Sequence, residues 1–355
     1  MVDLDDMELI GKTDPAGMLG LVENLPQQCE KAVENIENFK MGPDCLKGKP
    51  SNIIISGLGG SAIGGDFIRT CFLNEIKIPI VVNRYYHLPK FVRKRSLVIA
   101  VSYSGNTEET LSAYNEAKER KAKIVCLTSG GKMGENCKSD NIPFLSIPRG
   151  FPPRASLGYQ TLGLIGIFVK LGLVKDKSAE IKESIEVLKS LCNEMKRDVP
   201  IEKNIAKKLA VKLQDKIPVI YANQDLTDVA ALRWKDQFNE NSKSLAFNNV
   251  FPELNHNEIV GWEFPSTLLK KFVVIMIRDK KENPQVKKRF EITGKLLGGL
   301  ASEIVEVWTK GKSIMARLYS SILIGDFISV YLALLNGIDP TPVKRIEELK
   351  KQLVM

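Results

Sequence analysis

The chain has 355 residues, of which 44% are hydrophobic and 26% are charged. This length and composition are typical of a globular protein with two domains, and they exclude a wholly disordered chain. The formal net charge is +9, but the basic residues are scattered through helical segments and form no stripe interleaved with aromatic residues. We therefore expect no nucleic-acid partner, although the positive field would favour a small anionic substrate.

The sequence lacks the run of about 20 consecutive apolar residues that a membrane-spanning helix needs. It opens with MVDLDDMELIG, which is acidic where a signal peptide would be basic. We therefore expect a cytoplasmic protein with no membrane partner. Six cysteines lack CxxC spacing and predict thiols without a disulfide framework or a zinc site: Cys29, Cys45, Cys71, Cys126, Cys137 and Cys192.

From residue 52 onward, short apolar runs alternate with amphipathic segments. The apolar runs predict strands at residues 52–56, 78–83, 97–101, 124–127 and 144–147. Apolar residues at three- and four-residue spacing then predict helices over residues 155–197. A second alternation predicts strands at residues 217–221, 244–247, 272–277 and 304–307, then a long apolar helix at 314–335 and a charged helix from residue 343.

This alternation predicts an α/β protein with two doubly wound parallel-sheet, flavodoxin-like domains and flanking helices. We expect an N-terminal helical segment at residues 1–50 and a first domain at 51–154. A helical linker would follow at 155–200. The second domain, with the C-terminal helices, would occupy residues 201–355.

A glycine-rich loop, SGLGGSAIGG, follows the first predicted strand and precedes a helix. Glycines at such a junction let backbone amides approach an anion at the positive end of the helix. Gly57, Gly59 and Ala62 also satisfy the dinucleotide fingerprint, but the second strand ends in Val-Asn-Arg, with no acidic residue for the ribose. This disfavours NAD as a cofactor. Two alternatives stay open: NADP bound through Arg84, and a tight turn that binds no ligand.

A second strand-to-helix loop, SYSGNTEET, is crowded with hydroxyl groups. Ser102, Ser104 and Thr107 can donate hydrogen bonds to phosphate oxygens without adding charge, and the amides of the next helix would complete the site. The alternative is an ordinary helix cap, with Thr107 at the start and two acidic residues in the first turn. Three hydroxyls exceed what one cap requires, so the loop favours phosphate binding.

Together, GLGGSAIGGD and SYSGNTEET resemble the sugar isomerase (SIS) domain, whose members bind phosphorylated sugars on a serine- and threonine-rich loop. PPRASLGY, FNEN, ELNHNEIVGWE and DPTPV narrow the resemblance to the bifunctional phosphoglucose/phosphomannose isomerases. It implies two SIS domains in a homodimeric enzyme that converts glucose 6-phosphate or mannose 6-phosphate to fructose 6-phosphate through a cis-enediolate. Such a reaction needs no cofactor, and two distant histidines with unclustered cysteines predict no metal site.

The resemblance also implies roles for individual residues. The phosphate would be bound by Gly60, Ser61, Ser102, Ser104 and Thr107. Glu240 would be the catalytic base, at the carboxyl side of the second domain. His256, contributed by the partner subunit, would open the sugar ring. Arg154 would stabilise the enediolate, and Lys350, or the adjacent Lys351, would contact the sugar.

A module that senses a sugar phosphate without catalysis is the alternative from a different functional class. It would keep the phosphate loop but would not need Glu240, His256 or Arg154, and it would usually carry a DNA-binding domain. No helix-turn-helix pattern is evident in the first 50 residues.

Thr341 is a candidate for the residue that allows one site to accept both glucose 6-phosphate and mannose 6-phosphate.

Overall fold

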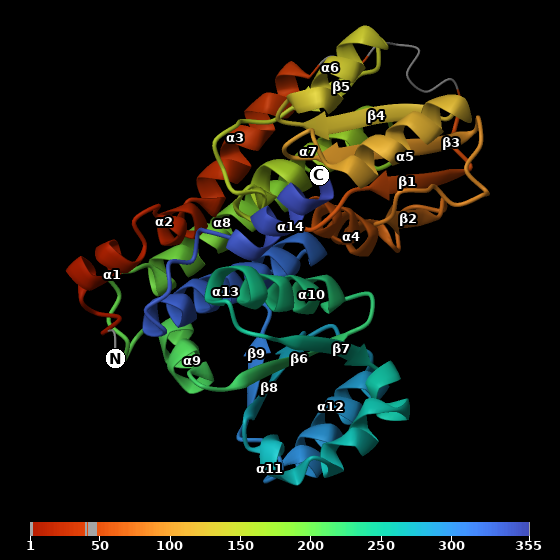
Figure 1. The fold of residues 1–355 in the computed structure, drawn as a ribbon. Coiled ribbons are helices and arrows are strands. Elements are labelled where there is room, and N and C mark those ends of the chain that lie inside the picture. Colours follow the sequence, from red (N-terminus) through yellow and green to blue (C-terminus); the bar gives the residue numbers. More distant parts are fainter. Residues whose placement is uncertain (1–2, 40, 42–47, 355) are drawn as a thin grey trace. The chain divides into compact units, whose positions relative to one another are not determined.

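The computed structural model describes residues 3–39, 41 and 48–354 (Figure 1). Their internal contacts divide the chain into two compact units. We name them by their sheets. The five-stranded unit holds residues 24–186 and 313–315, and the four-stranded unit holds residues 1–23, 187–312 and 316–355. Residues 155–200, predicted as a linker, therefore contribute helices to both units.

The five-stranded unit is built on a parallel sheet in the order β2-β1-β3-β4-β5. Its strands are β1 (Asn52–Ser56), β2 (Ile80–Asn83), β3 (Ser96–Ser102), β4 (Lys123–Thr128) and β5 (Phe144–Ser146). Every residue of β3 is buried, as expected for a central strand covered on both faces. The strand order reverses between β1 and β3, which makes the carboxyl ends of these two strands the topological switch point.

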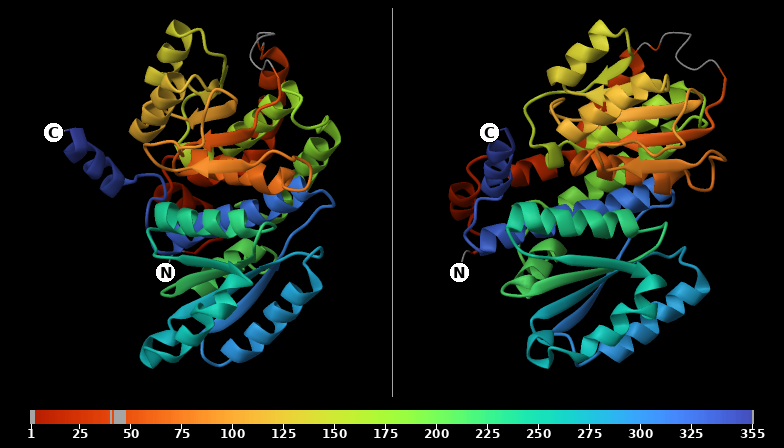
Figure 2. Two further views of the ribbon diagram at one scale, coloured as in Figure 1. Left: turned by 90° about the vertical axis from the view of Figure 1, so that its right-hand side faces the viewer. Right: turned by 45° about the vertical axis from the view of Figure 1, so that its right-hand side comes forward.

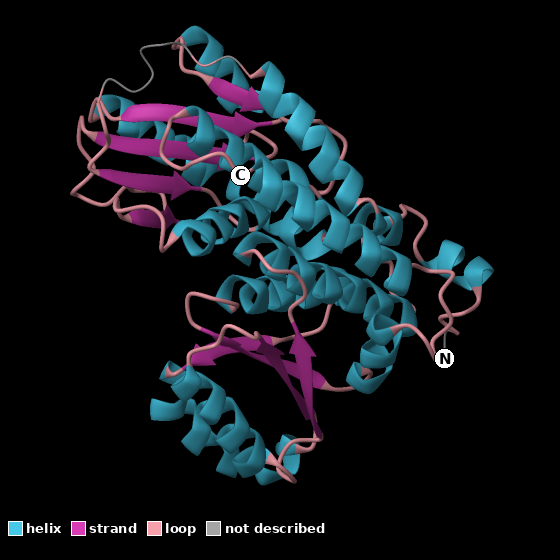
Figure 3. Ribbon diagram, turned by 180° about the vertical axis from the view of Figure 1, so that it is seen from behind, coloured by secondary structure: helices cyan, strands magenta, loops and turns pink. Residues whose placement is uncertain are grey.

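Helices cover both faces of this sheet, as Figure 3 shows with strands in magenta. The unit contains α3 (Leu25–Asn38), α4 (Gly60–Phe72), α5 (Glu108–Glu119), α6 (Gly131–Ser139) and α7 (Leu157–Lys170). Ile54 and neighbouring strand residues pack with Tyr114 of α5 and Met133 of α6. The next residue, Ile55, faces Gly65 of α4 on the opposite side. This alternation follows from the pleat of the strand.

The four-stranded unit contains a second parallel sheet, in the order β7-β6-β8-β9. Its strands are β6 (Ile217–Asn223), β7 (Phe247–Phe251), β8 (Phe272–Arg278) and β9 (Glu303–Trp308). The order repeats that of the first four strands of the other sheet. The strand predicted at residues 244–247 was placed too early, because Lys243 adopts a left-handed conformation (φ 55°) and the chain turns before the strand begins.

The helices of the four-stranded unit are α1 (Met7–Thr13), α2 (Met18–Glu23), α9 (Ile205–Leu213), α10 (Asp228–Gln237), α11 (Ser266–Leu269), α12 (Pro284–Leu297) and α14 (Lys344–Val354). α8 (Ser178–Met195) begins in the five-stranded unit and ends in this one, and α13 (Ile314–Leu335) lies almost wholly in it. By length and composition α13 is apolar enough to cross a membrane, but it is completely buried. It also holds Arg317 and Asp326 in ion pairs, which is typical of a core helix.

Candidate functional site

Two strand-to-helix loops meet at the switch point of the five-stranded sheet. The first follows β1 and enters α4 at Gly59 (φ 52°), with Ser61 buried in the first turn. The second follows β3 and enters α5 at Thr107. A Cβ atom at Gly57 would lie 2.9 Å from the carbonyl oxygen of Val101, so a side chain there would clash with the neighbouring strand. Because β1 and β3 are parallel neighbours, the helices that follow them both start at the same edge of the sheet and direct their positive ends to it.

The hydroxyl groups of the second loop bond to the loop itself. Ser102 Oγ and Thr107 Oγ1 are 2.9 Å apart, and Ser102 Oγ accepts from the amide of Gly105 at 3.1 Å. The hydroxyl of Ser104 accepts from the amide of Asn106 at 3.2 Å. Thr107 stands at the start of α5, but its side chain makes no capping hydrogen bond. The ordinary-cap alternative is therefore wrong, because that bond is what defines such a cap. The first amides of α5 remain oriented toward an incoming anion.

A third loop, which follows β4, supports the second one. A Cβ atom at Gly105 (φ 71°) would lie 1.7 Å from the carbonyl oxygen of Gly130, so the two loops are in contact. Asn106 Oδ1 accepts from the amide of Lys132 at 2.9 Å, and the amide of Met133 donates to the Gly105 carbonyl at 2.9 Å. Sequence reasoning missed this contact, although a glycine pair separated by two residues from a predicted strand was a signal for it.

Arg154 lies beside the start of α4. A Cβ atom at Gly60 would be 3.2 Å from the carbonyl oxygen of Pro153 and 3.4 Å from the Cα atom of Arg154. Arg154 is only 4% exposed, whereas a loop arginine is usually exposed. Its short 3-10 turn is fixed by Gln28, whose side-chain amide donates to the carbonyl of Ala155 at 2.8 Å. The structure thus places Arg154 next to the first of the two predicted phosphate-binding loops.

Glu240 belongs to the four-stranded unit and is half-buried. It lies in a π-helical turn, η2 (Phe238–Ser242), which continues α10. Such turns are frequent at functional sites. Because α10 starts at the carboxyl edge of the sheet and runs back, Glu240 lies at the amino-terminal end of β7 and not at the predicted carboxyl side. The side chains of Asn241 and Ser242 fix the turn through hydrogen bonds to Ser329 of α13, at 2.9 Å and 2.6 Å.

A buried ion pair holds α10 against α13. The Arg233 guanidinium donates to both carboxylate oxygens of Asp326, at 3.0 Å and 2.7 Å, and the side-chain amide of Gln237 donates to the same carboxylate at 3.0 Å. Burial raises the pKa of Asp326, while Arg233 and Gln237 oppose this effect. The contact lies one turn before η2 and so fixes the helix that carries Glu240.

His256 lies at the other end of β7 from Glu240. It ends a 3-10 turn, η3 (Glu253–His256), just after the carboxyl end of the strand, and it is exposed. A five-residue strand is roughly 13 Å long. The fold therefore does not bring Glu240 and His256 of one chain together.

The two candidate lysines lie on α14, and both Lys350 and Lys351 are exposed. Figure 2 shows this helix, in dark blue at the C-terminus, standing apart from the sheet and the other helices of its own unit. Its apolar side chains share one face of the helix, yet they are exposed to 41% at Ile346, 58% at Leu349 and 67% at Leu353. The structure does not select between the two lysines.

At the switch point of the four-stranded sheet, a charged side chain follows β8, where the hydroxyl-rich loop follows β3 in the other sheet. Asp279, directly after β8, is 2% exposed. Its carboxylate accepts from Thr309 Oγ1 at 2.7 Å and from Arg317 Nε at 2.8 Å. A buried ion pair therefore occupies this edge, so the two sheets differ in the chemistry of their switch points.

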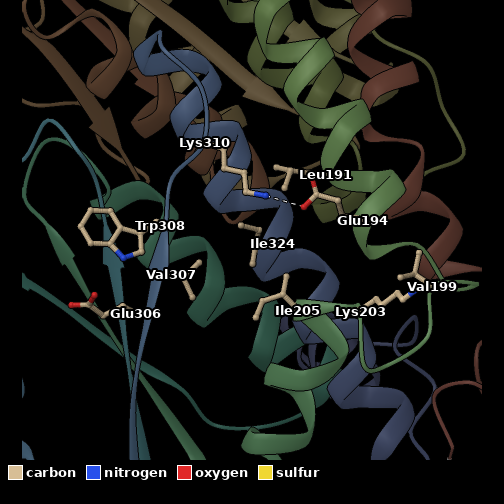
Figure 4. Close-up of a pocket in the computed structure, with 10 residues that line it drawn as sticks. All are labelled: Leu191, Glu194, Val199, Lys203, Ile205, Glu306, Val307, Trp308, Lys310 and Ile324. Carbon is tan, nitrogen blue, oxygen red and sulfur yellow. Dashed lines mark hydrogen bonds and ion pairs between the residues drawn. The ribbon is translucent and has the colours of Figure 1, made fainter.

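The four-stranded unit also contains a pocket of about 500 Å³, which holds none of the predicted site residues (Figure 4). Its walls are mainly apolar and include Leu191 and Ile324 with the ring of Trp308. Lys310 and Glu194 pair with each other at 2.9 Å on its rim. Because its walls are mainly apolar, this pocket is a poor match for a sugar phosphate.

Within the described part of the chain, no group of three or more His, Cys, Asp or Glu side chains is placed to hold a metal ion. No disulfide links the cysteines there, which are Cys29, Cys71, Cys126, Cys137 and Cys192. The sixth, Cys45, lies outside the described residues.

Residues 48–137 match the model of the SIS domain family, and residues 202–353 match that of the bacterial phospho-glucose isomerase C-terminal SIS domain. A bifunctional phosphoglucose/phosphomannose isomerase from Caldicellulosiruptor bescii is 47% identical over 95% of this chain and 98% of that protein. One from Aquifex aeolicus is 39% identical over 92% of this chain and 98% of that protein.

The crystal structure of a glucose-6-phosphate isomerase like protein from Thermus thermophilus has a TM-score of 0.63 at 18% identity, over 96% of this chain and 98% of that chain. This likeness and the two parallel sheets confirm the predicted α/β fold with two SIS domains. The relatives confirm the predicted resemblance: this chain belongs to the bifunctional phosphoglucose/phosphomannose isomerase family.

Proposed function

We propose that this protein is an aldose-ketose isomerase that interconverts glucose 6-phosphate and mannose 6-phosphate with fructose 6-phosphate. The observation that carries the proposal is the hydroxyl-rich loop at the β1–β3 switch point, where Ser102 and Thr107 meet at the N-terminus of α5. Such a site suits the phosphate group of a sugar. Membership in the isomerase family supports the reaction.

The phosphate is held by Ser61, Ser102, Ser104 and Thr107 together with the first amides of α4 and α5. Gly60 belongs to the same site because its lack of a side chain lets the loop lie against Pro153. Hydroxyl and amide groups donate hydrogen bonds directly to the phosphate oxygens, so the proposed binding needs no metal ion.

The isomerisation itself moves one proton from C2 to C1 and one from O2 to O1. Glu240 removes the proton on C2 of the open-chain aldose, and the C1 carbonyl oxygen takes up the negative charge of a cis-enediolate. The proton is returned to C1 while the O2 proton moves to O1, which leaves the ketose with no net gain of atoms or electrons. Arg154 stabilises the enediolate by its charge. Lys350, or Lys351 beside it, contacts the sugar.

One base can serve both aldoses, because glucose and mannose 6-phosphates differ only in configuration at C2. Rotation about the C2–C3 bond after ring opening presents either hydrogen to the same carboxylate, and both lead to a common enediolate. Thr341, in the loop before α14, remains our candidate for tolerating both substrates.

The ring must open before the base can act, and His256 is the proposed acid for this step. Its place at the far end of β7 from Glu240 supports a homodimer in which each site takes His256 from the partner. The exposure of this histidine in the single chain is consistent with such a contribution.

Replacing Glu240 by Gln is the most direct test, because the amide keeps the size of the side chain but cannot accept the C2 proton. We expect kcat to fall by at least about 10²-fold for both aldoses with little change in KM, measured by coupled assays in metal-free buffer. Glu202→Gln, the same change at an exposed position of the same unit, should leave both constants unchanged. An active E240Q enzyme would refute the assignment.

The same assays decide between the enzyme and its alternatives. A sensing module would bind sugar phosphates but turn none over, and an NADP-dependent oxidoreductase would need added nucleotide. We expect turnover with EDTA present and with neither cofactor nor nucleotide added. We also expect the protein to work in the cytoplasm, where sugar phosphates are metabolised.

A further inference from the structure

Lys243 has an unusual backbone conformation for its residue type. It follows η2, and its φ and ψ of 55° and 27° lie in the left-handed region, which glycine and asparagine usually occupy at the end of a helix. Its amide donates to the carbonyl of Phe238 and so closes the turn. A lysine in this place suggests that the side chain contributes something that glycine would lose.

The ammonium group of Lys243 is surrounded by backbone carbonyls. It donates to the carbonyl oxygens of Glu240 at 2.6 Å and Asn241 at 3.3 Å, both in the turn that carries the proposed base. It also donates to the carbonyl of Pro340 at 2.9 Å. Pro340 is 97 residues further along the chain, in the loop that contains Thr341 and leads into α14.

These contacts join two segments of the site. Carbonyls at the end of a helix carry partial negative charge, and a lysine ammonium is the group that best satisfies several of them at once. The side chains of Asn241 and Ser242 fix the same turn to α13. Lys243 thus adds a connection from the turn to the Pro340 loop, which those two bonds do not supply.

We propose that Lys243 is a positioning residue for the isomerase reaction. Its ammonium fixes the backbone of Glu240 relative to the loop that bears Thr341 and precedes α14. The inference rests on the proposed role of Glu240. It adds a residue that touches no substrate yet determines the position of the base.

Lys243→Met tests the idea because it keeps most of the length of the unbranched side chain and removes both donors and charge. We expect kcat to fall roughly 10- to 100-fold for both aldoses, as for a displaced catalytic group, with KM nearly unchanged because the phosphate loops belong to the other unit. Lys243→Arg, which keeps charge and donors, should restore most of the rate.

Lys216→Met is the matched control, since Lys216 also donates to a backbone carbonyl, that of Lys270 at 3.1 Å, in the same unit. It should leave kcat unchanged, and the two Met variants should have similar melting temperatures. If K243M kept full kcat, or lost rate only in proportion to lost stability, Lys243 would be a helix cap and the inference would be wrong. An active E240Q enzyme would instead remove the base assignment on which the inference rests.

Discussion

Arg233 of α10 and Asp326 of α13 form a two-point ion pair whose side chains are only 3% and 5% exposed. The pair links α10, which leads to the proposed base Glu240, with α13, the central helix of the same unit. Two charges taken out of water in this way depend on each other, because neither can be hydrated when the other is removed.

Asp326→Asn should therefore be strongly destabilising. It leaves the Arg233 guanidinium buried without a counter-charge, and we expect the free energy of unfolding to fall by about 3–5 kcal/mol in chemical denaturation. Glu303→Gln breaks an ion pair with Lys212 in the same unit, but those side chains are 39% and 45% exposed. That control should cost less than about 1 kcal/mol. If the free energy of unfolding fell by the same amount in D326N and E303Q, burial would not explain the importance of the Arg233–Asp326 pair.

Thr107→Ala should weaken substrate binding more than turnover. The substitution removes a proposed phosphate donor and the hydroxyl that lies 2.9 Å from Ser102 Oγ, so KM should rise about 10-fold for both aldoses while kcat stays within about threefold. Inorganic phosphate, tested as a competitive inhibitor, should lose affinity in parallel. Ser139→Ala removes an exposed hydroxyl from the end of α6 and should change neither constant. A sugar-phosphate complex with the phosphate elsewhere would disprove the site.

Gly105→Ala probes the contact between the second and third loops. The new methyl group would meet the carbonyl of Gly130 at 1.7 Å, and the loops would have to separate. Gly172→Ala is a matched control, since Gly172 has a similar φ of 64° but nothing within 4 Å of its Cβ position. Both variants suffer the strain of a left-handed alanine, about 1 kcal/mol, so thermal unfolding should show G105A to be clearly less stable. Equal melting temperatures for G105A and G172A would mean that the two loops can separate without loss of stability.

Mixing two inactive variants tests whether His256 is shared between subunits. A heterodimer of E240Q and H256A chains contains one site with an intact Glu240 and an intact partner histidine, and one site with neither. After complete subunit exchange, half of the dimers are heterodimers, so roughly a quarter of the wild-type activity should return. Each variant incubated alone is the control. No recovery after exchange had been verified by native mass spectrometry would place His256 outside the shared site.

Much of the fold could be predicted because buried parallel strands are continuous apolar runs. The first strand was predicted at 52–56 and lies at Asn52–Ser56. The failure at 244–247 has a local cause, since the left-handed Lys243 interrupts an otherwise suitable sequence and a lysine gives no sign of such a turn.

The site was harder to predict because it depends on tertiary contacts. Glycine-rich and hydroxyl-rich motifs predicted a phosphate site on the β1 and β3 loops, yet the contact with Gly130 and the burial of Arg154 involve segments far away in sequence. The position of Glu240 was misjudged for a similar reason. A motif next to a helix does not reveal which edge of the sheet that helix ends on.

The buried carboxylate of Asp279 has a consequence for how the two sheets divide their work. Its bonds to Thr309 and Arg317 occupy the edge of the second sheet that corresponds to the proposed phosphate edge of the first. The two sheets share a strand order, but we expect only the first to bind an anion. Calorimetric titration with a sugar phosphate should therefore saturate at one ligand for each chain.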